Sequence, residues 1–120
     1  MNEPKIKLPD AEYIHYTQDG KRYTVCTMRQ KALHTIGMDN RRHHQPYTRH
    51  GRKFYRPYRN YFSAPEAGDK DLEKLVDAGY MDREVFHTGT DRECVWYSFN
   101  RDGLDWLGEQ LGIHIWNETE

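Results

Sequence analysis

The sequence predicts an α+β domain with three to four helices, a C-terminal β-hairpin and an extra N-terminal β-hairpin. Two pairs of β-prone runs each flank a turn signal, one containing Asp19 and Gly20 and one spanning 89–92. Apolar residues recur at helical spacing in three further segments, and each segment follows a residue that can cap a helix. Because 120 residues is the length of one domain, we expect residues 1–120 to form a single domain.

The N-terminal part of the chain is predicted to contain a tail, a hairpin and a helix. Residues 1–10 contain two prolines and alternate in charge, which is typical of a tail. The β-prone runs 12–16 and 22–26 flank an Asp-Gly turn, which is a strong short-range signal of a hairpin. Thr27 is a good N-cap, and the apolar spacing after it predicts a helix over 28–36.

The C-terminal half shows the clearest helical patterns. Asp69 is a good N-cap for a helix over 70–78, and a second hairpin is expected from the runs 84–88 and 93–99. A last helix is predicted over 101–111. The apolar residues expected to form one shared core are Leu72, Leu75, Val76, Val85, Val95, Tyr97, Leu104, Leu107 and Leu111.

The segment 41–62 is unusual because it combines cationic with aromatic residues and contains no Asp or Glu. Its lysine and arginine residues are Arg41, Arg42, Arg49, Arg52, Lys53, Arg56 and Arg59. Closely spaced cations create a positive potential that attracts polyanions, and tyrosines can stack on bases or bond to phosphates. We therefore predict that these seven residues contact nucleic acid, with Tyr47 and Tyr55 as stacking or phosphate-bonding partners.

The same segment gives mixed signals for secondary structure. Residues 39–52 are predicted to be irregular, because Pro46 and Gly51 interrupt them. Aromatic residues recur at positions 54, 58, 61 and 62, which is helical spacing and favours a structural role for most of them. Since Pro57 suits the first turn of a helix, we expect a short helix over 57–62.

The formal net charge of −1 conceals a strong segregation of charge along the chain. Residues 1–40 carry six Lys or Arg and five Asp or Glu, residues 41–62 carry seven and none, and residues 63–120 carry five and fourteen. This pattern suits a basic surface for a polyanion, and it equally suits an internal contact between the basic segment and the acidic half. The sequence alone is compatible with both readings.

The order of helix, basic segment, helix, hairpin and helix resembles a winged helix-turn-helix domain. Within it, 72–81 resembles the end of a recognition helix, and 97–104 resembles the exit from the wing. The resemblance implies a winged-helix-like core over 27–112, with a tail and hairpin at 1–26 and a tail at 113–120. The expected recognition helix departs from the pattern, because Asp71, Glu73 and Asp77 on its solvent side would repel phosphates.

A second resemblance involves two shorter stretches of the sequence. Residues 47–62, together with 104–108, are similar to small uncharacterised proteins of phages and prophages. This similarity implies a regulatory protein in the cytoplasm of a bacterial host. It carries no assigned activity.

The sequence shows no pattern typical of catalysis or cofactor binding, so we expect a protein that is not an enzyme. His43, His44 and His50 lack the paired cysteines of a closed zinc site, so we predict no metal and no cofactor. Cys26 and Cys94 are far apart, which indicates two buried thiols in a reducing cytoplasm, with one disulfide as the alternative. Since no run approaches about 18 apolar residues, we expect no membrane span, and we expect no signal peptide.

Three function classes follow from these patterns. The first is a small nucleic-acid-binding or regulatory protein whose foremost partner is duplex DNA. The second is a protein-interaction module, such as a phage-encoded inhibitor of a host nucleic-acid machine, similar to anti-CRISPR proteins. A structural or assembly protein is the third, and both a monomer and a homodimer are compatible with the sequence.

Overall fold

The computed structural model describes residues 6–65, 67–87, 89 and 93–117, and every structural statement below refers to these residues. They form three α-helices, one 3-10 helix and eight strands that belong to three small sheets. In chain order, the elements are β1 (Tyr13–Gln18), β2 (Lys21–Cys26), α1 (Met28–Thr35), the 3-10 helix η1 (Arg42–His44), β3 (Tyr47–Arg49), β4 (Arg52–Tyr55), β5 (Phe62–Pro65), α2 (Lys70–Asp77), β6 (Met81–His87), β7 (Glu93–Phe99), α3 (Arg101–Leu111) and β8 (His114–Ile115).

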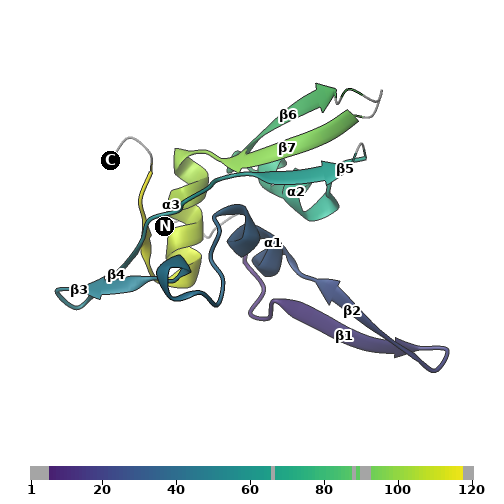
Figure 1. Cartoon of the computed structure of the whole chain (residues 1–120), viewed down its shortest axis with the longest axis horizontal. Helices are drawn as coiled ribbons and strands as arrows, with labels where there is room; N and C mark the ends of the chain where they lie inside the picture. The colour runs from purple at the N-terminus through teal and green to yellow at the C-terminus, as the bar shows by residue number, and fades with distance from the viewer. Residues whose placement is uncertain (1–5, 66, 88, 90–92, 118–120) are drawn as a thin grey trace.

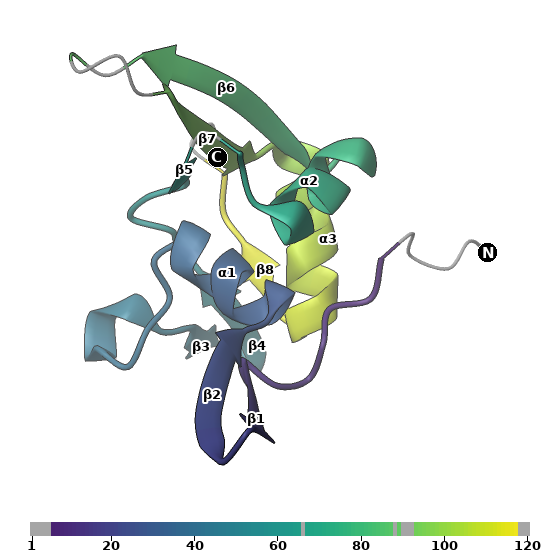
Figure 2. The same ribbon diagram turned by 90° about the vertical axis from the view of Figure 1, so that its right-hand side faces the viewer.

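The three sheets surround a small helical centre. Figure 1 shows α3 in the middle of the body, with the hairpins β1–β2, β3–β4 and β6–β7 extending from it in three directions. The hydrogen-bonded strand orders are β1-β2, β3-β4-β8 and β5-β7-β6. Figure 2 shows β8 beside α3, where β8 pairs in parallel with β4. The sheet β3-β4-β8 therefore joins the middle of the sequence to its C-terminal end.

The helices begin where capping residues predict them. Thr27 accepts a hydrogen bond from the backbone of Gln30, and Asp69 accepts two from the first turn of α2. Asn100 accepts one from the backbone N–H of Gly103 at 2.8 Å. The predicted helices over 28–36, 70–78 and 101–111 are therefore confirmed to within one residue at their ends.

Two tight hairpins have the same turn geometry. Asp19 and Gly20 have φ values of 52° and 75°, and His50 and Gly51 have 54° and 77°. Positive φ at both central residues is the type I′ geometry that matches the twist of a hairpin. The first hairpin is confirmed, whereas β3–β4 replaces the irregular chain that was predicted over 39–52.

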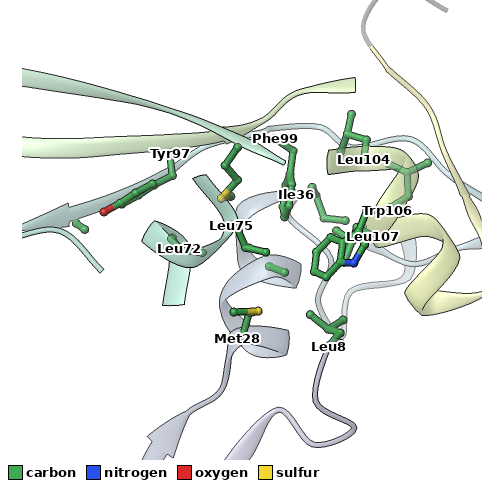
Figure 3. Close-up of a cluster of buried hydrophobic side chains, with 14 of the residues drawn as sticks. Leu8, Met28, Ile36, Leu72, Leu75, Tyr97, Phe99, Leu104, Trp106 and Leu107 are labelled. Atoms are coloured by element: carbon green, nitrogen blue, oxygen red, sulfur yellow. The ribbon is translucent and has the colours of Figure 1, made fainter. Parts of the chain in front are cut away.

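The core lies between α1, α2, α3 and the inner face of the β5-β7-β6 sheet, as Figure 3 shows. Most of the predicted core residues are buried in it, including Leu72, Leu75 and Leu107, which have no exposed surface. Val85 is the exception at 45% exposure, because β6 is an edge strand whose far end extends beyond the core. Burial of such apolar surface is the main stabilising contribution to the fold.

The N-terminal segment is more than the tail that the sequence predicted. Leu8 belongs to the core, and its backbone N–H donates to the side chain of Gln110 at 2.8 Å. The indole of Trp106 donates to the carbonyl of Ile6 at 2.9 Å. Residues 6–8 therefore pack along α3.

The winged helix-turn-helix prediction is wrong. The short helix expected over 57–62 does not form, and Phe62 instead begins β5, which pairs with β7. The aromatic residues at helical spacing do not share a helix, because Phe54 and Phe62 belong to strands of two different sheets. Pro57 would be tolerated in the first turn of a helix, but the pairing of β5 with the distant strand β7 outweighs the local helical signal. Within the described residues, no helix is long and apolar enough to span a membrane.

Candidate nucleic-acid interface

One face of the β3-β4-β8 sheet carries a column of aromatic rings. Because side chains alternate along a strand, Tyr47 shares this face with Phe54, its partner in register. The two rings stack with centroids 5.8 Å apart, and the ring of Trp116 stacks on Phe54 at 5.7 Å. The indole of Trp116 also donates a hydrogen bond to the hydroxyl of Tyr47 at 2.9 Å. These contacts tie the three rings together.

Three arginines lie on the same face as the aromatic column. Arg49 and Arg52 face each other directly across the β3–β4 hairpin. The guanidinium of Arg52 lies 5.9 Å from the centre of the Phe54 ring, and that of Arg56 lies 5.3 Å from the Trp116 ring. We call this surface the arginine–aromatic face; it consists of Tyr47, Arg49, Arg52, Phe54, Arg56 and Trp116.

The cations of this face have no acidic partner among the described residues. The ion pairs of the described chain leave every Lys and Arg of 41–62 without a carboxylate within 4.0 Å. The acidic half instead pairs with other cations: Lys31 bonds to Asp69 and Asp71, and Arg83 bonds to Glu73. Among the described residues, no ion pair therefore joins the basic segment 41–62 to the acidic half.

The pKa shifts agree with this distribution of ion pairs. Burial lowers the pKa of Lys31, but hydrogen bonds to Asp69 and Asp71 outweigh it and leave the pKa above its ordinary value. The pKa of Glu73 is lowered, first by the hydrogen bond from Tyr97 and then by Arg83. Two of the acids of α2 that were expected to face solvent, Asp71 and Glu73, therefore have structural partners.

The other predicted cations do not belong to this face. Arg41 and Arg42 are exposed near η1, and Lys53 points to the opposite side of β4 from Arg52. Arg59 donates twice to the carbonyl of His34, at 2.7 and 3.0 Å, which anchors its guanidinium. Of the seven predicted cations, only Arg49, Arg52 and Arg56 therefore belong to the arginine–aromatic face.

Tyr55 is wrongly placed in the predicted contact set. Its side chain is 1% exposed, and its hydroxyl donates to the carbonyl of Ile36 at 3.1 Å. Burial raises the pKa of Tyr55 to about 12. The ring is a core residue and has no free face for a base.

A polar cavity continues the arginine–aromatic face toward the second sheet. It has a volume of about 480 Å³ and lies between 56–60, the end of β7, the first turn of α3 and Trp116. We call it the arginine pocket, because Arg56, Arg59 and Arg101 line it and no carboxylate does so among the described residues. Asn60 holds its wall in place by two hydrogen bonds to the backbone of Phe99, at 2.8 and 2.9 Å.

Phe54, Trp116 and Arg101 were missed as site residues. The helical spacing of the aromatics at 54, 58, 61 and 62 favours a structural role for most of them, and Trp116 lies in a short apolar stretch with no functional signal. In the sequence, Arg101 is a residue of the first turn of a predicted helix and carries no signal of a binding role. Only the pairing of β4 with β8 and of β5 with β7 brings them beside the basic segment.

The described side chains show no grouping for metal chemistry. Within that part of the chain, no three His, Cys, Asp or Glu residues gather to hold a metal ion. Cys26 and Cys94 are free thiols, and Cys26 is exposed, whereas the sequence predicts that it is buried.

Neither a protein-family model nor a characterised protein nor a solved structure matches this chain.

Proposed function

We propose that this protein binds nucleic acid through the arginine–aromatic face. The observation that carries the proposal is the direct opposition of Arg49 and Arg52 without a described carboxylate partner. Like charges placed opposite each other on a hairpin are unfavourable in the free protein, and a bound polyanion relieves the repulsion. Arg56 extends the line of positive charge along the aromatic column.

The physical consequence of the proposal is a salt-dependent affinity. Each phosphate neutralised by a cation releases counterions and contributes about 0.9 to the slope of log affinity against log salt for duplex DNA. If Arg49, Arg52, Arg56 and one further cation take part, the slope is roughly −4. Replacement of Arg49 and Arg52 by glutamine should flatten the slope by about 2.

The test is a fluorescence-anisotropy titration with labelled mixed-sequence DNA, both as duplex and as single strand. We compare the wild type with Arg49→Gln/Arg52→Gln at two or more salt concentrations. The matched control is Lys70→Gln/Lys74→Gln, which removes the same charge from exposed positions on α2. We expect the control to keep the wild-type slope.

Two results would contradict this function. One is the absence of binding to either form of DNA at low salt. The other is an unchanged slope in Arg49→Gln/Arg52→Gln, with thermal unfolding showing that the variant is folded. Either result would leave the opposed arginines without a nucleic-acid role.

A second candidate function is a protein-interaction module, and the β1–β2 hairpin favours it. By register, Ile14, Tyr16, Tyr23 and Val25 lie on one face of this hairpin, and each is between 41% and 55% exposed. Figure 1 shows the hairpin extending away from the body. A two-stranded hairpin with an uncovered apolar face is only marginally stable alone, so a partner protein would stabilise it.

The two candidate functions make different predictions for a hairpin variant. Ile14→Thr/Val25→Thr keeps β-branched residues in the strands and removes apolar surface. If the hairpin mediates association, sedimentation should show assemblies in the wild type that the variant lacks. If nucleic acid is the ligand, the variant should bind DNA as the wild type does.

A further inference from the structure

The outer face of the β5-β7-β6 sheet carries a second group of exposed aromatic residues. The rings of Tyr61 and Trp96 stack at 5.1 Å, and the ring of Phe86 lies 5.0 Å from Trp96. Their exposed fractions are 44%, 41% and 39%, which is high for such large apolar groups. We call these three residues the aromatic platform. The function proposed above does not use it.

The platform and the arginine–aromatic face meet at the arginine pocket. Trp116 and Arg56 line the pocket from the side of the β3-β4-β8 sheet. Ser98 and Asn60 line it from the side of the platform, where Ser98 lies two residues after Trp96 on the same face of β7. The pocket thus connects two aromatic surfaces, and three arginines are among its described lining residues; Arg59 is bonded to the carbonyl of His34, and Arg101 pairs with Asp105 at 3.7 Å.

This order of groups matches the chemistry of single-stranded nucleic acid. Guanidinium groups bind phosphate oxygens, and exposed aromatic rings stack on unpaired bases of any sequence. A duplex keeps its bases stacked inside the helix and cannot offer their flat faces to Tyr61 or Trp96. We therefore propose that the ligand is single-stranded nucleic acid, with a phosphate in the arginine pocket and neighbouring bases on the aromatic platform. This inference rests on the proposed nucleic-acid function.

The charges around the platform restrict the path of the strand. Asp82 and Glu84 of β6 lie opposite Ser98 and Trp96 and are exposed on the same face of the sheet. Their carboxylates repel phosphates, so the sugar–phosphate backbone of the bound strand cannot follow β6. The sugar–phosphate backbone follows β5 instead, where the outward-facing residues are uncharged.

The test compares an oligothymidylate of about 12 nucleotides with a duplex of the same length, by anisotropy, at about 50 mM and about 200 mM salt. We expect the wild type to bind the single strand at least about tenfold more tightly. Tyr61→Leu/Trp96→Leu should weaken single-strand binding about tenfold or more and leave its salt slope unchanged, because stacking releases no counterions. Arg56→Gln/Arg101→Gln should flatten that slope by about 1.4, at about 0.7 per phosphate of a single strand.

The matched control is Tyr16→Leu/Tyr23→Leu, which removes another exposed stacked pair, with ring centroids 5.2 Å apart, from the β1–β2 hairpin. It should bind the oligonucleotide like the wild type. Thermal unfolding checks each variant, and Tyr61→Leu alone serves if the double variant is unfolded. Its expected loss is about threefold or more.

Several results would overturn the inference, and they separate it from the proposed function. Equal or tighter binding of the duplex, with a slope that still depends on Arg49 and Arg52, would refute the single-strand ligand and keep the nucleic-acid function. Loss of affinity in the control equal to that in the platform variant would also refute it. Displacement of the oligonucleotide by equimolar polyglutamate would assign the site to acidic proteins. No binding of either DNA would remove both proposals.

Discussion

Gly103 provides a sharp test of how α3 meets the rest of the fold. It is buried in the first turn of α3, and a Cβ atom placed on it would lie 1.8 Å from the carbonyl oxygen of Tyr80 and 2.8 Å from the ring of Phe99. Helix propensity alone predicts that Gly103→Ala stabilises the protein by about 1 kcal/mol. The structure predicts the opposite sign, because backbone atoms must move well over an ångström to admit the methyl group.

The size of the effect follows from the contacts that would be disturbed. Overpacking costs up to about 3 kcal/mol, and the hydrogen bond from Asn100 N–H to the Tyr80 carbonyl, 3.2 Å long, contributes about 1 kcal/mol. After the gain in helix propensity, the net loss in the free energy of unfolding is about 3 kcal/mol. For a domain of this size, the midpoint of thermal unfolding should fall by about 10 °C.

The assay is thermal and urea unfolding of Gly103→Ala beside Glu109→Ala, an exposed position in the same helix. We expect Glu109→Ala to change the free energy of unfolding by less than about 0.5 kcal/mol. A midpoint for Gly103→Ala that equals or exceeds that of the wild type would refute the close approach of α3 to Tyr80. It would also call into question the position of Arg101 in the arginine pocket.

Three further predictions concern stability and titration. Leu75→Ala, at a fully buried position, should lower the free energy of unfolding by about 2–5 kcal/mol, whereas Val85→Ala on the exposed edge should cost less than about 1 kcal/mol; urea unfolding measures both. Asp71→Ala should lower the free energy of unfolding by about 1 kcal/mol because of its 2.9 Å contact with Lys31, and Lys31→Met should abolish this loss in a double-mutant cycle. The pKa of His34 is lowered from 6.5 by partial burial and then by the charge of Arg59, so His34 favours folding above pH 6.5, and this contribution is lost as the pH falls below 6.5 toward the folded-state pKa. An NMR titration should show the pKa of His34 rising in Arg59→Gln, and an unchanged pKa would show that Arg59 does not act on the ring.

Much of the local structure was predictable because it depends on residues close in sequence. The caps Thr27, Asp69 and Asn100 lie within three residues of the N–H groups that they bind. The Asp19 and Gly20 turn requires only two residues with positive φ. Apolar spacing placed Leu72 and Leu107 in the core, since a helix buries one stripe of its surface.

The errors occurred where strand pairing decided the outcome. The segment 47–65 contains three strands, and two of them bond to partners from the C-terminal half of the chain. The helical spacing of its aromatic residues and the position of Pro57 both favour a helix, because each of these signals depends on only a few neighbouring residues. A short strand such as β5 is specified by β7, which lies on the other side of α2 in the sequence.

The sequence by itself determined the charge of segment 41–62, the absence of acids within it and the helices that form the centre of the protein. Only the tertiary structure decided which cations share a surface. Trp116 reaches Tyr47 across 69 residues, and Asn60 reaches Phe99 across 39. The tertiary structure also places Arg56 and Arg101 in the lining of one pocket and buries Tyr55 in the core. No local pattern encodes them, because the free energy that stabilises them comes from packing and backbone pairing between segments that are distant in the chain.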